Sequence, residues 1–120
     1  MNIWVIVGLA AMATALILLP RLGWISVREA QDLIKSGALL VDVRSPGEFG
    51  GGSVPGAVNM PLGDIREQVD SGQISKNDPV ILFCASGTRS SMAKRQLRGA
   101  GLTNVHNLGS YSRARQLQSD

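Results

Sequence analysis

The amino-acid sequence predicts an α/β domain with a small parallel sheet flanked by helices, preceded by one transmembrane helix. Strand-like and helix-like segments alternate from Ile25 onward, an order that brings strands together in parallel with helices on both faces. Pro79–Phe83 is a continuous apolar run, typical of a strand covered on both faces. Ile3–Leu19 carries no charged residue. The 120 residues therefore divide into a membrane segment over 1–24 and one domain over 25–120.

The apolar run favours an uncleaved membrane anchor over a signal peptide. No Lys or Arg precedes it, and the residues around Pro20 form a poor cleavage site. A span needs about 20 apolar residues, with about 17 as the lower limit, which residues 3–20 just reach. On one continuous helix, Trp4 and Trp24 would lie about 30 Å apart, as anchors at the two membrane interfaces do. A cleaved signal and a buried core helix are the alternatives.

Charge predicts the orientation of this anchor. Arg21, Arg28 and Lys35 follow the apolar run closely, and Lys and Arg gather on the cytoplasmic side of membranes. We therefore expect a single-pass protein of the plasma (cell inner) membrane whose domain faces the cytoplasm. The single cysteine agrees with this location, because it cannot form an internal disulfide and a reducing compartment would keep it a thiol.

Caps, apolar spacing and turn residues predict the elements of the domain. Ser26 and Glu29 form a capping box at the start of the first helix, and Gly37 ends it. The Gly- and Pro-rich stretch 44–56 is predicted to be a loop. The other expected elements are strands over 38–43, 57–60, 79–83 and 105–108, and helices over 64–69, from the Cys84 turn to Gly101, and over 110–118.

Basic residues gather in the C-terminal part of the chain. From Cys84 onward there are six, against the single acidic Asp120. The domain lacks the interleaved aromatic residues and the motifs of nucleic-acid binding, so we expect no nucleic-acid partner. Most of these charges are interpreted as a solvated helix face, with a basic rim around an anion site as the alternative. They are Arg89, Lys94, Arg95, Arg98, Arg113 and Arg115.

Cys84 lies between the central predicted strand and a helix, where open parallel sheets bind ligands. The small residues that follow let the backbone curl until several amide N–H groups point at the sulfur, an arrangement that binds anions and stabilises a thiolate. Arg89 adds a positive charge, and Ser86 and Thr88 add hydroxyl donors. The alternative is a cysteine that acts as a small buried hydrophobe. The predicted site is Cys84 with the loop residues Ala85, Ser86, Gly87, Thr88, Arg89 and Ser90.

Four motifs follow one another along the chain: Leu40–Arg44, Glu48-Phe49, Val54–Pro61 and Cys84–Ser90. In this order they resemble the motifs of the rhodanese domain, and the resemblance spans Ile25 to about Leu117. It implies a sulfurtransferase in which Cys84 attacks a sulfane-sulfur donor such as thiosulfate and becomes a persulfide. The sulfur then passes to a thiol or another nucleophilic acceptor, and no metal or cofactor is needed.

The resemblance also implies roles for other polar residues. Asp42, Arg44 and Glu48 are expected to be architectural, fixing the loop near the site by ion pairs and hydrogen bonds. His106 lies in a predicted strand away from the cysteine turn, so no Cys–His dyad is expected. The chain departs from the family pattern at Ser53, Ala85 and Ser110, where His, a basic residue and Gly are common, which bears on donor preference and turnover.

Loop length separates this pattern from that of the cysteine phosphatases. Cys84 and Arg89 are spaced C-x4-R, one residue shorter than the C-x5-R loop with which those enzymes surround phosphate. A tighter ring suits one sulfur atom better than a tetrahedral phosphate, so phosphatase or arsenate reductase activity is disfavoured. The other alternative is a non-catalytic binding or scaffolding module at the membrane that keeps the fold.

Overall fold

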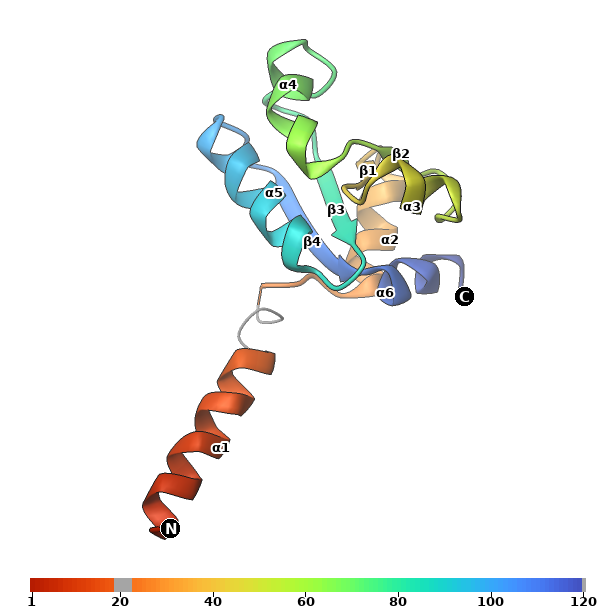
Figure 1. The fold of residues 1–120 in the computed structure, drawn as a ribbon. Coiled ribbons are helices and arrows are strands. Elements are labelled where there is room, and N and C mark those ends of the chain that lie inside the picture. The colour runs from red at the N-terminus through yellow and green to blue at the C-terminus, as the bar shows by residue number, and fades with distance from the viewer. Residues whose placement is uncertain (19–22, 120) are drawn as a thin grey trace.

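The computed structural model describes residues 1–18 and 23–119. Within them lies a four-stranded, all-parallel sheet of order β2-β1-β3-β4 (Figure 1). The predicted α/β class, with a small parallel sheet flanked by helices, is confirmed. The strands are β1 Leu39–Asp42, β2 Val58–Asn59, β3 Val80–Cys84 and β4 Val105–Ser110; the α-helices are α1 Ile3–Leu18, α2 Val27–Lys35, α3 Pro46–Gly50, α4 Ile65–Asp70, α5 Thr88–Gly99 and α6 Tyr111–Arg115, with 3-10 turns η2 Leu62–Asp64 and η3 Gln116–Gln118.

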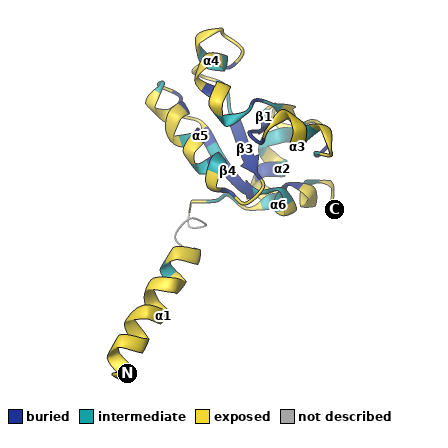
Figure 2. Ribbon diagram, viewed as in Figure 1, coloured by how far each residue is buried: buried dark blue, intermediate teal, exposed yellow. Residues whose placement is uncertain are grey.

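Strand β3 is buried along its whole length because helices cover both of its faces (Figure 2). Its side chains alternate between two apolar clusters, as the two-residue period of a strand requires. Leu82 and Cys84 pack in the cluster that includes Leu97 of α5. Ile81 and Phe83 pack on the opposite face, in the cluster formed with α2 and α6. The continuous apolar run of the sequence therefore fills two cores, and Cys84 belongs to the α5 side.

Parallel pairing brings the carboxyl ends of all four strands to one edge of the sheet. Asp42, the last residue of β1, pairs with Asn59 of β2 and with Phe83 of β3. Cys84 is the next residue of β3 and pairs with Ser110 at the end of β4. This edge therefore collects the polar residues that the sequence singles out, as expected for an open parallel sheet.

The stretch 44–56, predicted to be a loop, contains the short helix α3. Its capping box is complete, since Ser45 Oγ accepts from the Glu48 N–H at 3.2 Å and Glu48 Oε1 accepts from the Ser45 N–H at 3.1 Å. Pro46 occupies the first turn, where its missing N–H costs no helical hydrogen bond. The glycines obscured these start signals in the sequence, and α3 carries Glu48 to the site.

Two further boundaries differ from the sequence prediction. Asp64 makes no side-chain capping bond to α4, and the turn η2 precedes this helix instead. Strand β4 continues beyond Leu108 to Ser110, because its pairing with β3 shifts register between Leu82 and Phe83 and resumes at Gly109. The extension brings Ser110 beside Cys84.

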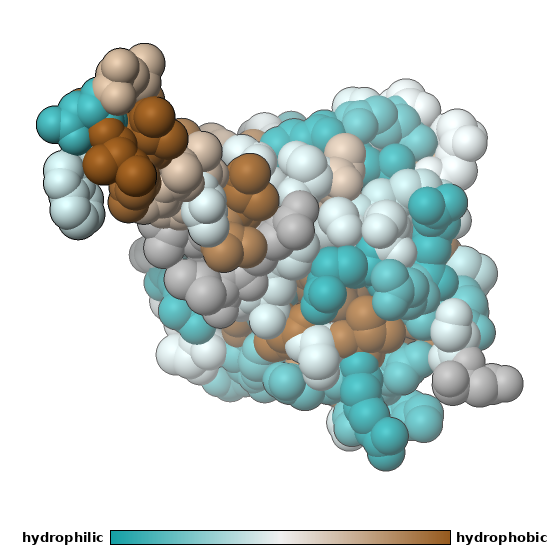
Figure 3. Space-filling view, turned by 90° about the horizontal axis from the view of Figure 1, so that it is seen from below, coloured by the Kyte–Doolittle hydropathy of each residue, from teal (hydrophilic) through white to brown (hydrophobic). Residues whose placement is uncertain are grey.

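Helix α1 projects from the domain (Figure 1), and its apolar side chains are exposed (Figure 3). Residues 19 and 20 of the predicted span lie outside the described residues. Among the residues that are described, none of the helices has the length and apolarity required to cross a membrane. Trp24 is not on a helix with Trp4, because it forms a β-bridge with Asn107 of β4. The interpretation of Trp24 as an interfacial anchor is therefore wrong, because Trp24 is part of the domain.

Candidate active site

Cys84 ends β3, and the turn Ala85-Ser86-Gly87 leads from it into α5. The residue is only 1% exposed. Gly87 has φ +97°, a left-handed conformation that suits glycine, and its amide N–H donates to Cys84 Sγ at 3.0 Å. The turn therefore curls back on the sulfur and directs a backbone donor at it.

Ser90, in the first turn of α5, ties this loop to β4. Its buried hydroxyl donates to the Gly87 carbonyl at 3.1 Å and to the Gly109 carbonyl at 3.4 Å. Ser86 forms an antiparallel bridge with Ser110, and the Tyr111 N–H donates to the Ala85 carbonyl at 3.3 Å. The start of the turn is thus fixed by backbone contacts and its end by the Ser90 hydroxyl.

The loop lowers the pKa of the Cys84 thiol below its ordinary value. Burial acts in the opposite direction, because a charged thiolate is poorly solvated inside the protein. Hydrogen bonds from the backbone amides of Ser90, Gly87 and Ser86 outweigh that effect. The arrangement thus favours a thiolate at the end of β3.

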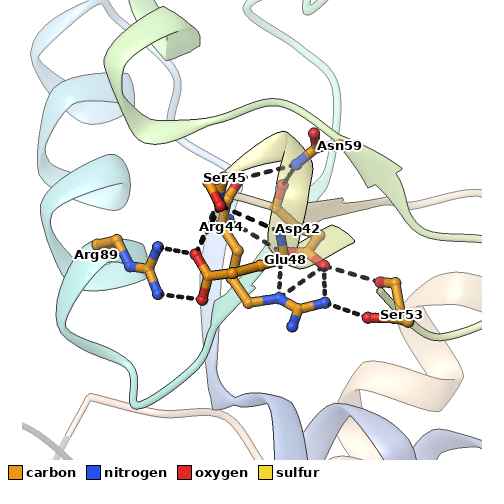
Figure 4. Close-up of polar contacts among 8 residues, drawn as sticks. Asp42, Arg44, Ser45, Glu48, Ser53, Asn59 and Arg89 are labelled. Carbon is orange, nitrogen blue, oxygen red and sulfur yellow. Dashed lines mark hydrogen bonds and ion pairs between the residues drawn. The ribbon is translucent and has the colours of Figure 1, made fainter. Parts of the chain in front are cut away.

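Arg89 is paired with Glu48 of α3 in a two-pronged ion pair (Figure 4). The distances are 2.6 Å from Nη1 to Oε1 and 3.0 Å from Nη2 to Oε2. Hydrogen bonds from Arg89 and from the Ser45 amide lower the pKa of Glu48 to about 2, so the pair is ionised at neutral pH. The guanidinium is directed at this carboxylate and connects α5 to α3 across the site.

Asp42 and Arg44 form a second, buried ion pair, with 2.8 Å between Asp42 Oδ2 and Arg44 Nη2 (Figure 4). Asp42 Oδ2 also accepts from the Ser53 hydroxyl at 2.8 Å, and Arg44 Nη2 donates to the Gly52 carbonyl at 2.7 Å. The hydrogen bond with Asp42 raises the pKa of Arg44 further. The pair thereby fastens the loop after α3 to the end of β1.

Comparison with known proteins identifies the family of this constellation. Residues 26–115 match the family model of the rhodanese-like domain. The chain belongs to the rhodanese family. It is 41% identical over 71 residues to the uncharacterized protein YqhL of Bacillus subtilis, an alignment that covers 59% of this chain and 55% of that protein. It is 38% identical over 69 residues to thiosulfate sulfurtransferase PspE of Escherichia coli, covering 58% of this chain and 66% of that protein.

The same fold occurs in the structure of the human single-domain sulfurtransferase TSTD1. The TM-score is 0.69 at 28% identity, and the match covers 82% of this chain and 97% of the human one. By contrast, the chain spans only 55% and 66% of the lengths of the Bacillus and Escherichia relatives. The rhodanese fold of this chain thus matches nearly the whole length of the human single-domain protein.

The rhodanese domain brings most of the predicted site residues together. Ala85, Ser86 and Thr88 form the exposed face of the loop, whereas Gly87 and Ser90 lie buried beneath it. Arg89 belongs to the loop but pairs with α3, so its charge is shared with Glu48. The participation of these residues in the reaction stays a prediction.

The predicted basic rim is only partly available to a ligand. Arg113 donates to the carbonyls of Leu108 and Ile25 at 2.9 and 2.6 Å, and its guanidinium lies 5.5 Å from the centroid of the Trp24 ring. His106 is placed away from the loop, with its Nε2 2.7 Å from Asn104 Oδ1. Among the described residues, no group of His, Cys, Asp and Glu side chains is arranged to hold a metal ion.

Two features of the site have no signal in the local sequence. A pocket opens beside the loop, and Trp24 lies at its wall, far along the chain from Cys84. Ser110, which the sequence presents only as a departure from a glycine, accepts from the Arg113 amide and caps α6 at this pocket. The other residues that line the pocket are Ser26, Glu29, Ser86, Ser112 and Arg113.

Proposed function

We propose that this chain is a sulfurtransferase that carries a sulfane sulfur as a persulfide on Cys84. The observation that carries the proposal is the hydrogen bond of 3.0 Å from the Gly87 amide to Cys84 Sγ, within a turn that lowers the thiol pKa. A thiolate is the nucleophilic form of cysteine. The name of the Escherichia coli relative, a thiosulfate sulfurtransferase, supports the same reaction class.

The reaction has two displacement steps at sulfur. In the first, the Cys84 thiolate attacks the outer sulfur of thiosulfate; the new sulfur–sulfur bond forms on Sγ as sulfite departs with the electron pair of the broken bond. In the second, a thiolate or another nucleophilic acceptor attacks the outer sulfur of the persulfide, and Cys84 leaves as a thiolate. Neither step needs an external oxidant or reductant, and the division replaces one transfer by two simpler ones.

The loop suits an anionic sulfur better than a phosphate. An anion bound in a cysteine phosphatase loop needs the loop arginine, whereas here both terminal nitrogens of Arg89 donate to Glu48. The donors directed at the sulfur come from backbone amides. Because Cys84 is 1% exposed, a donor must present a single atom to reach it, and the terminal sulfur of thiosulfate meets this requirement.

The test is a steady-state comparison of substrates on the full chain. We expect transfer of sulfur from thiosulfate to a small thiol, and turnover of aryl phosphate or arsenate that is at least about a hundredfold lower in kcat/KM, because only the sulfur donor matches the loop. His106→Ala, a substitution away from the loop, serves as the matched control and should retain activity. Turnover of aryl phosphate or arsenate without sulfur transfer would overturn the proposal, and absence of any turnover would favour a binding module.

We further propose that the chain is attached to the plasma (cell inner) membrane through the segment 3–20, as a single-pass protein with its domain facing the cytoplasm. Helix α1 lacks charged residues, and its large apolar side chains face solvent, with Trp4 and Leu16 77% and 73% exposed. An exposed apolar surface of this kind marks an interaction site. Basic residues follow the segment closely, as on the cytoplasmic side of membrane proteins.

Membrane fractionation of the full chain tests this attachment. We expect the protein to stay with membranes after an alkaline carbonate wash and the double variant Leu9→Lys/Leu16→Lys to move to the supernatant, since each charge costs about 3 kcal/mol in a bilayer. Met92→Lys, which alters an exposed apolar residue of α5, is the control and should stay with membranes. Release of the unaltered chain by carbonate would contradict attachment. Digestion of the domain by protease outside intact cells would contradict its orientation.

A further inference from the structure

Trp24 packs directly on two glycines of the active-site edge. A Cβ atom added at Gly87 would overlap the six-membered ring of Trp24, with Cε2 only 3.0 Å away. A Cβ added at Gly109 of β4 would lie 2.5 Å from Cδ2 of the same ring. Both glycines have positive φ, 97° and 100°. The ring therefore rests on bare backbone at two positions where no other residue would leave room for it.

The same two glycines hold the hydrogen bonds around Cys84. The Gly87 amide donates to Sγ, and the Gly87 and Gly109 carbonyls both accept from the Ser90 hydroxyl. A displacement of either glycine thus changes the donors that face the sulfur. Trp24 contacts both glycines and is itself partly buried, so its ring lies behind the turn that presents these donors.

The position of Trp24 is fixed from its other neighbours. Trp24 forms a parallel β-bridge with Asn107, and the Ile25 amide donates to the Asn107 carbonyl at 2.9 Å. Arg113 stacks over the indole and donates to the Ile25 carbonyl. These contacts attach the residue to β4 and α6 and fix the position of its ring.

We propose that Trp24 is a positioning residue for the sulfur-transfer reaction: its ring holds Gly87 so that the Gly87 amide stays directed at Cys84 Sγ. This inference rests on the proposed function, because it concerns the thiolate that the reaction uses. Removal of the ring leaves a void behind the turn, into which the Gly87 peptide relaxes. The amide then moves off the sulfur, and the pKa of Cys84 rises.

The charged groups around the site do not depend on Trp24 for their partners. The two ion pairs join β1, α3 and α5 through side chains that stay in place when the indole is removed. Arg113 loses its ring contact but keeps two backbone carbonyls. A change in the titration of Cys84 therefore reports the geometry of the turn. The charged groups around the site are Asp42, Arg44, Glu48, Arg89 and Arg113.

The test is the pH dependence of Cys84 alkylation by iodoacetamide, followed by mass spectrometry on the full chain. For Trp24→Ala we expect a midpoint at higher pH. Relative to its own plateau at high pH, the rate near neutral pH should fall about two- to tenfold, the worth of one hydrogen bond. The plateau rates of the variants are not compared with one another, because a change in the exposure of the thiol also changes that rate. Trp24→Phe, which keeps a six-membered ring, should recover most of the original profile.

Trp4→Ala, at the other tryptophan of the chain, is the matched control and should leave the midpoint unchanged. If Trp24→Ala does not fold, the pH dependence of alkylation is measured on Trp24→Leu instead, since leucine keeps apolar volume but not the flat ring. A folded Ala or Leu variant with the midpoint of the unaltered chain would overturn the proposal. Alkylation needs no sulfur donor, so this measurement tests the role of Trp24 even if the chain does not transfer sulfur.

Discussion

Replacement of Cys84 by serine is expected to lower sulfur transfer from thiosulfate by about a thousandfold or more. Serine is close in size to cysteine, so the buried position at the end of β3 should accept it. Its hydroxyl is not ionised near neutral pH and cannot form the persulfide, which removes the covalent step itself rather than adjusting it. The measurement is the steady-state rate with thiosulfate and a thiol acceptor.

The controls for Cys84→Ser must separate chemistry from folding. Circular dichroism should be the same for the variant and the unaltered chain, because the core around β3 keeps its volume. His106→Ala, made in parallel, should transfer sulfur at the normal rate. Full transfer activity in a folded Cys84→Ser variant would mean that another group accepts the sulfur.

Replacement of Asp42 by alanine is expected to destabilise the domain by about 3 kcal/mol or more, the range observed when one partner of a buried ion pair is removed. Arg44 would keep its charge with its main partner gone, and its side chain is only 8% exposed. The Ser53 hydroxyl would lose its acceptor at the same time. Urea unfolding followed by circular dichroism measures the change.

Asp70→Ala is the matched control for this prediction. It breaks the ion pair with Arg66, whose two side chains are 61% and 65% exposed, so we expect a loss of about 0.5 kcal/mol or less. Equal effects of Asp42→Ala and Asp70→Ala would contradict the assignment of a structural role to the buried pair. An effect confined to activity, with unchanged stability, would instead indicate that Asp42 acts on the substrate.

The elements that the sequence predicts well are those whose signals are local. The apolar run Pro79–Phe83 predicts the buried strand β3, which the structure shifts by one residue, to Val80–Cys84. The capping box at Ser26 is present, since Ser26 Oγ accepts from the Glu29 amide at 3.0 Å. Ala93 and Leu97 face the core from α5, as their spacing indicates. In each case the residues that determine the element lie close together in the sequence.

The features that escaped prediction depend on contacts between distant segments. Arg89 is interpreted from sequence as a charge for the anion site, but its partner Glu48 lies 41 positions away on a helix that the glycines concealed. Trp24 is predicted to lie at a membrane interface from its distance to Trp4, whereas it packs on Gly87 and Gly109 of the domain. Packing between distant segments leaves no pattern in the neighbouring sequence, so only the folded structure shows it.

A single-turnover experiment shows whether Cys84 receives a sulfane sulfur. The full chain is mixed with excess thiosulfate without an acceptor, and released sulfite is compared with the mass of the peptide that contains Cys84. We expect equimolar sulfite and a gain of one sulfur atom on Cys84, with neither in Cys84→Ser. Sulfite release without a persulfide on Cys84, or no reaction with any sulfane donor, would contradict this expectation.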